Sequence, residues 1–179
     1  MKQLPSLMCL ALVLAGCATK APDVTTQVNQ FTNERTDAME DVLLKGPGNP
    51  PRELIWLSAT RYSKEFSRAP IFIGIKYMAR AETGALNIDP GQSLTIVADG
   101  TPYKLTGSGS LNARTTTKEN GQEFAWETAI YEILPAQLIR ISQAKKVQIL
   151  VKGQRGLVER ELDADAMNRL RRFVAHLAL

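Results

Sequence analysis

The side chains with the clearest capacity for chemistry are carboxylates that recur at even spacing. Glu123 and Glu127, and likewise Glu159 and Glu161, would each share one face of a β-strand, because side chains alternate between the two faces. Two close carboxylates in a cleft could act as the acid and the base of a glycosidase-type hydrolysis. The alternating Glu-Arg-Glu sequence at 159–161 is more typical of a solvated sheet face with cross-strand ion pairs. We therefore favour a structural role for both pairs and keep hydrolysis as an alternative.

Other patterns in the sequence give little support for catalysis. His176 is the only histidine and lies three residues from the carboxyl terminus, so we assign it no catalytic or metal-binding role. Helix capping explains Asp163 and Asp165, which flank the start of an expected helix. The cluster Gly107–Ser110 lacks the Gly-x-Ser-x-Gly spacing of a nucleophile elbow, because Thr106 stands where the first glycine should be. The sequence has no phosphate-binding loop, no calcium loop and no dinucleotide fingerprint, so we expect no cofactor.

A short apolar segment near the amino terminus ends in small residues and a cysteine. It runs for nine residues from Leu7 to Ala15 behind Lys2, whereas a helix that crosses a bilayer needs about 20. This length is typical of a signal peptide. The last four residues, Leu14-Ala15-Gly16-Cys17, resemble the lipobox of bacterial lipoproteins. An ordinary cysteine in a secretory signal is the alternative.

The resemblance implies that residues 1–16 are removed and that Cys17 carries diacylglycerol and an acylated amino group. Two or three acyl chains hold a protein to a bilayer where one does not. Ala18 stands where an aspartate would signal retention at the inner membrane, which implies the outer membrane. We expect a lipid-anchored protein of the cell envelope that faces the periplasm.

The two cysteines are accounted for by this interpretation, because Cys9 lies in the removed segment and Cys17 is the lipidation site. No cysteine remains for disulfides, for Cys/His catalysis or for a usual zinc site, so we expect no metal. The 179 residues are 44% hydrophobic, which suits one globular domain. A net charge of +4 is weak for such a length and gives no support for nucleic-acid binding.

Residues 17–52 have the composition of a tether between the lipid and the domain. Within it, residues 24, 28, 31, 35, 38 and 42 follow alternating steps of four and three, which is typical of one helical face. An amphipathic helix near 33–44 that packs on the domain and a disordered segment are both compatible with this pattern. The sequence Gly46-Pro47-Gly48-Asn49-Pro50-Pro51 ends any helix.

Residues 53–179 have the pattern of a β-rich globular domain. Two strand-like runs come first, at Leu54–Tyr62 and Ile71–Met78, and three hairpins follow, with turns at Asp99-Gly100, Asn120-Gly121 and Gly153–Gly156. In the return arm of the second hairpin we expect Phe124, Trp126, Thr128, Ile130 and Glu132 to face the core. We also assign six aromatic residues to the core rather than to a ligand-stacking platform: Trp56, Tyr62, Phe72, Tyr77, Trp126 and Tyr131.

The sequence predicts helices near 135–145 and near 164–178. The expected fold class is therefore α+β, a mainly antiparallel sheet built from hairpins, either a sandwich or a strongly curled sheet. Basic residues in the last third could converge on a patch for lipid headgroups or an anionic envelope polymer. Interleaved acidic residues favour solvated helix ends and turns instead. These basic residues are Lys145, Lys146, Lys152, Arg155, Arg160, Arg169, Arg171 and Arg172.

For the function, the sequence favours a non-catalytic binding or assembly module with an envelope protein as its partner. Such a module predicts an exposed apolar patch or a free strand edge. A carrier of lipid or another apolar ligand is the first alternative and predicts a cavity between the sheet and the helices. A carboxylate-dependent envelope hydrolase is the second.

Overall fold

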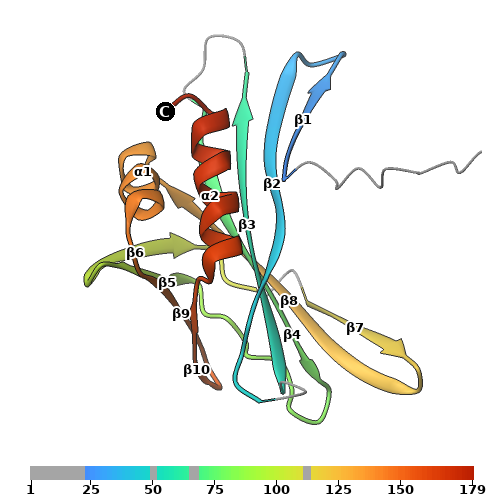
Figure 1. Ribbon diagram of the computed structural model, residues 1–179. Coiled ribbons are helices and arrows are strands. Elements are labelled where there is room, and N and C mark those ends of the chain that lie inside the picture. The colour runs from blue at the N-terminus through green and yellow to red at the C-terminus, as the bar shows by residue number, and fades with distance from the viewer. Residues whose placement is uncertain (1–22, 49–51, 65–68, 111–113) are drawn as a thin grey trace, which may run out of the picture.

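The computed structural model describes residues 23–48, 52–64, 69–110 and 114–179 (Figure 1). The predicted signal peptide and Cys17 lie outside these residues. The described residues form ten strands and two helices. In chain order these are β1 (Val24–Asn29), β2 (Glu34–Leu44), β3 (Glu53–Ser63), β4 (Ile71–Arg80), β5 (Gly91–Ala98), β6 (Thr101–Gly107), β7 (Arg114–Glu119), β8 (Gln122–Ile133), α1 (Pro135–Gln143), β9 (Val147–Gly153), β10 (Gly156–Glu161) and α2 (Ala164–His176).

All ten strands belong to one antiparallel sheet in the order β1-β2-β3-β4-β8-β6-β5-β9-β10, with β7 also paired to β8. The sheet narrows sharply between β6 and β8. These two strands share a single register pair, Gly107 with Tyr131. This joint separates a first part (β1–β4, β7 and β8) from a second part (β5, β6, β9 and β10). In Figure 1, β5 and β6 run across the view, whereas β1, β2 and β3 run from top to bottom. The predicted α+β class is thus confirmed, as a bent, open sheet.

Both predicted helices are confirmed, and both begin as the sequence indicates. Pro135 occupies the first turn of α1, and the Asp163 carboxylate accepts a hydrogen bond of 3.0 Å from the amide of Ala166 at the start of α2. Leu138 of α1 and Phe173 of α2 are fully buried against the sheet. We call the sheet face that the helices cover the inner face and the opposite one the outer face. Within the described residues, no helix is long and apolar enough to cross a membrane.

The expected helix near 33–44 is wrong, because these residues form strand β2. The register with β3 slips between Met39 and Val42, so one extra residue stands in β2 there. This bulge changes the alternation, and the buried positions become Asp37, Met39, Val42 and Leu44. These buried positions are two, three and two residues apart. Without knowledge of the register with β3, such spacing resembles that of a helix. The sheet begins at Val24 and therefore includes residues that the sequence analysis assigned to the tether.

The predicted core face of β8 is also wrong. The buried side carries Glu127, Ala129, Tyr131 and Ile133, and the opposite side, with Trp126, is only partly covered. The sequence pattern favoured the other face because its side chains are larger and because Glu127 had the character of a surface residue. The Glu127 carboxylate can be buried because it accepts hydrogen bonds inside the protein.

Candidate functional site

The structure does not bring the candidate carboxylates together as catalytic pairs. Glu159 accepts a hydrogen bond of 3.0 Å from Gln148, and Glu161 forms an ion pair of 3.1 Å with Lys146, both on an exposed face of the β9–β10 hairpin. Such contacts are those expected of a solvated sheet face. Glu123 is exposed and Glu127 is buried, so these two do not share a cleft.

Glu127 acts as a clamp for two loops. Its carboxylate accepts hydrogen bonds from the backbone amides of Asn87 (2.9 Å) and Ile88 (3.0 Å) and from the hydroxyl of Ser110. Ser110 belongs to the glycine-serine cluster, whose role here is to join the loop after β6 to the core. These three hydrogen bonds hold the loops at Asn87–Ile88 and at Ser110, which is a structural role for the carboxylate.

His176 belongs to a buried ionic cluster that the sequence did not predict. Asp37 is fully buried and receives hydrogen bonds from Thr26 (2.7 Å), Arg35 (2.9 Å), Arg61 (2.9 Å) and His176 (3.0 Å). Burial alone would raise the pKa of Asp37, but these four donors outweigh it and hold the pKa well below its usual value.

The cluster does not have the geometry of a catalytic triad. The Asp37 carboxylate and the Thr26 hydroxyl both lie next to the same ring nitrogen of His176, Nε2, at 3.0 and 3.1 Å. A proton relay needs the acid on one ring nitrogen and the nucleophile on the other. The cluster therefore joins the end of α2 to β1, β2 and β3. In the described part of the chain, no group of three His, Cys, Asp or Glu residues could hold a metal ion.

The basic residues of the last third do not converge on one patch. Arg169 and Arg172 of α2 form ion pairs with Asp23, at 3.5 and 2.7 Å. Arg171 donates to backbone carbonyl oxygens at the end of α1. Arg160, in contrast, is buried inside the molecule.

The outer face of the first part of the sheet carries apolar side chains that α2 does not cover. It collects aromatic residues that the sequence assigned to the core; of the six, only Tyr77 and Tyr131 are buried. Helix α2 contacts the opposite side, since His176 reaches Asp37 and the carbonyl of Leu177 accepts from Arg61 on the inner face. The apolar residues of the outer face are Leu43, Leu54, Trp56, Tyr62, Phe72, Met78, Phe124, Trp126 and Ile130.

Ring contacts give this face a defined shape. Trp56 and Trp126 stack with their ring centroids 5.4 Å apart, and Tyr62 meets Phe72 edge to face at 5.9 Å. A shallow groove of about 300 Å³ lies beside Tyr62, Phe72 and Ile130. A second groove of about 270 Å³, next to Met78 and Phe124, continues the apolar surface to the other end of the strands.

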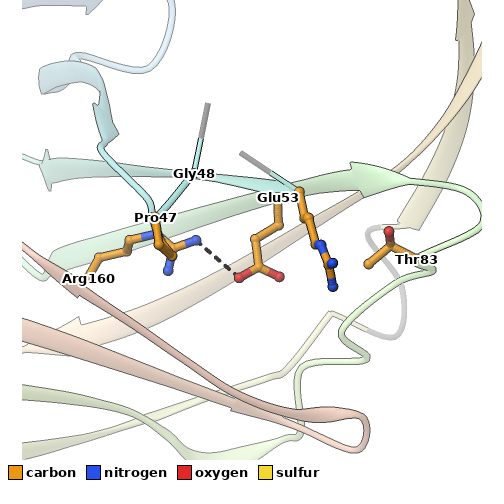
Figure 2. Close-up of a pocket in the computed structure, with 6 residues that line it drawn as sticks. Pro47, Gly48, Glu53, Thr83 and Arg160 are labelled. Atoms are coloured by element: carbon orange, nitrogen blue, oxygen red, sulfur yellow. Dashed lines mark hydrogen bonds and ion pairs between the residues drawn. The ribbon is translucent and has the colours of Figure 1, made fainter. Parts of the chain in front are cut away.

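A second candidate site, which we call the Arg160 cleft, has a volume of about 570 Å³. Figure 2 shows the side chains of Arg160 and Glu53 pointing toward one another inside it. Arg160 is 5% exposed and donates to Glu53 at 3.1 Å and to the carbonyl of Glu159 at 2.7 Å. The residues that line the cleft are Pro47, Gly48, Arg52, Glu53, Thr83 and Arg160.

The Glu53 carboxylate is held on its other side by Tyr77, whose hydroxyl donates to it at 3.3 Å. Burial, and then the negative charge of Glu53, raises the pKa of Tyr77 far above its usual value, so the phenol stays protonated. This arrangement could not be predicted from the sequence, because Glu53, Tyr77 and Arg160 come from β3, β4 and β10. The alternation of Glu159, Arg160 and Glu161 could have indicated only that Arg160 faces away from its two neighbours.

Comparisons with family models, curated proteins and solved structures found no significant match to the sequence or to the fold.

Proposed function

We propose that this protein is a lipid-anchored, non-catalytic assembly module of the cell envelope, and that its outer face binds a partner protein. The observation that carries the proposal is the aromatic outer face of β3, β4 and β8, which α2 leaves uncovered. Trp, Tyr, Phe and Met side chains on an exposed surface are typical of the centres of protein interfaces.

The shape of this face suits a protein better than a small apolar ligand. A carried ligand needs a pocket that removes most of its surface from water, whereas both grooves of the outer face are shallow and open. The space between the helices and the sheet, where a carrier would hold its ligand, is filled by side chains such as Leu138, Ile141, Leu170 and Phe173. The carrier alternative is therefore less favoured.

The charges on this face also favour a protein over a lipid surface. Lys76 forms an ion pair with Asp41 across the middle of the face, so the two charges cancel. At the ends of the strands, Arg80 and Glu132 again have opposite signs. Binding to anionic headgroups needs an excess of basic residues, so an apolar surface with balanced charges is better matched to a protein of similar character.

The amino-terminal end of the domain supports attachment close to the membrane. Asp23 is fixed to α2 by Arg169 and Arg172. The six residues that follow Cys17, up to Asp23, span at most about 22 Å when fully extended. With Cys17 acylated, the domain would stay within that distance of the bilayer. The outer membrane, facing the periplasm, remains our expected location.

The test is site-specific photo-crosslinking in intact cells followed by binding to the purified partner. A crosslinking residue at Ile130, which is 51% exposed on the outer face, is compared with one at Leu157, which is 58% exposed on β10. We expect Ile130, and not Leu157, to capture one defined envelope protein, and we expect Cys17→Ala to reduce the yield by removing the anchor.

The captured protein should then bind the purified chain, and Ile130→Glu should weaken that affinity by about tenfold or more, while Leu157→Glu leaves it unchanged. Capture of phospholipid alone, capture of a second copy of the chain alone, equal capture from both positions, or an unchanged affinity of Ile130→Glu would each refute the proposal.

A further inference from the structure

The Arg160 cleft has more positive than negative charge, even after its internal ion pair is counted. Glu53 offsets one of the two arginines that line it, Arg160 and Arg52. In the described part of the chain, Arg52 forms no ion pair or hydrogen bond. Arg155 adds a further cation beside the lining residue Thr83, because its guanidinium packs on Gly84, where an added Cβ would lie 1.9 Å from Nη1.

The guanidinium of Arg160 is held in place before any ligand arrives. It is fixed by Glu53, by the carbonyl of Glu159 and by the backbone at Gly46, where an added Cβ would lie 2.9 Å from its terminal nitrogen. Its Nε atom is buried without a hydrogen-bond partner. Fixed donors bind anions without the entropic cost of ordering a long side chain.

We propose that the Arg160 cleft binds the oxyanion group, a carboxylate or a phosphate, of a small polar molecule. Arginine is the side chain best suited to such groups, because its planar fork presents several N–H donors to their oxygens. The cleft of about 570 Å³ is large enough for a sugar-sized molecule, and the Thr83 hydroxyl is available for a further hydrogen bond.

A purely structural ion pair would explain only part of this arrangement. It would account for the contact of 3.1 Å between the buried Arg160 and the partly exposed Glu53. It would not account for the open volume beside the pair or for Arg52, which lines that volume without a partner. The proposal does not depend on partner binding at the outer face, although Arg52 and Glu53 also line the second groove of that face.

The test is calorimetric titration of the full-length protein in non-ionic detergent at low ionic strength. Three probes share one sugar frame, namely glucose, glucuronate and glucose 6-phosphate. We expect at least one of the two anions to bind and glucose not to bind. Preference for glucuronate would indicate an acidic saccharide as the source of the oxyanion, and preference for glucose 6-phosphate would indicate a phosphorylated molecule.

Three variants locate the binding in the cleft. Arg52→Gln should weaken the affinity by about tenfold or more, since it removes a charged hydrogen bond. Arg140→Gln, at an exposed position on α1, is the matched control and should change nothing. Glu53→Gln keeps an acceptor for Arg160 but removes the negative charge, so it should tighten anion binding severalfold. This gain is not expected of a merely structural pair.

The fold of each variant is checked by its circular dichroism spectrum and melting temperature. Absence of anion binding to the folded wild-type protein at millimolar concentration would overturn the proposal. So would equal binding of glucose, an unchanged affinity of folded Arg52→Gln, or an equal loss in Arg140→Gln.

Discussion

The Nε2 atom of His176 lies 3.0 Å from Oδ1 of Asp37, and this contact joins two residues that are 139 positions apart in the chain. It fixes the last turn of α2 to the second strand of the sheet. Because Asp37 also accepts hydrogen bonds from Thr26, Arg35 and Arg61, four polar or cationic side chains are held by this one carboxylate.

Replacing Asp37 with asparagine should therefore be strongly destabilising. The change leaves two arginines next to a neutral, buried side chain, and breaking a buried ion pair from one side typically costs about 3–5 kcal/mol. Equilibrium unfolding in urea at pH 7 measures this loss. The matched control is Asp41→Asn, which breaks an exposed ion pair with Lys76 and should cost about 1 kcal/mol or less. Equal losses in the two variants would contradict the structure.

The same carboxylate should make the stability depend on pH in the acid range. Its pKa is lowered in the folded state, so the unfolded chain takes up the proton at a higher pH than the folded protein does. The stabilisation is complete above the usual pKa of 3.8 and is lost as the pH falls below that value toward the folded pKa. The difference in unfolding free energy between wild type and Asp37→Asn should shrink as the pH falls from 5 to 3. A constant difference down to pH 3 would show that Asp37 is not the group responsible.

Because Glu127 holds two loops, its replacement should strongly reduce the stability of the fold. The sequence pattern placed this residue on the face of β8 away from the core. Glu127→Ala leaves the amides of Asn87 and Ile88 and the Ser110 hydroxyl without their acceptor, so we expect a loss of about 3 kcal/mol or more. Hydrogen exchange of the two amides should accelerate in the variant. Glu123→Ala, exposed on the same strand, should stay within about 0.5 kcal/mol of wild type. If the amides of Asn87 and Ile88 exchange as slowly in Glu127→Ala as in wild type, Glu127 does not hold these loops.

Local signals account for the parts of the fold that could be predicted. Both residues of each predicted two-residue turn have positive φ, with 47° and 84° at Asp99 and Gly100 and 50° and 78° at Asn120 and Gly121. Asparagine, aspartate and glycine tolerate this conformation, so the hairpins were visible in the sequence. The start of α2 was visible because an aspartate such as Asp163 caps a helix by accepting a hydrogen bond from an amide of its first turn.

The features that could not be predicted depend on pairing between distant segments. The bulge in β2 is defined only by its register with β3. The buried face of β8 follows from loops that reach Glu127 from positions near 88 and 110. The two candidate sites have the same character, since Trp56 and Trp126 meet from different strands and Arg160 reaches Glu53 across 107 positions. Spacing along one segment cannot show such contacts.

The close packing at the joint between the two parts of the sheet predicts that any side chain at position 107 destabilises the protein. An added Cβ would lie 2.5 Å from the carbonyl oxygen of Ile130 and 2.6 Å from the ring of Tyr131. That ring cannot move aside freely, because Tyr131 is fully buried and its hydroxyl is hydrogen-bonded to Ser93 of β5 at 2.9 Å.

Gly107→Ala should therefore destabilise the protein by about 2 kcal/mol, within the range found for overpacked cores. Urea unfolding measures the loss, and Ser108→Ala next to it is the control, with an expected change of about 0.5 kcal/mol or less. Since β6 meets β8 only at this register pair, hydrogen exchange in Gly107→Ala should rise first at the amides of β6. A variant as stable as wild type would mean that β6 and β8 can separate here without cost, and that the bend of the sheet is set elsewhere.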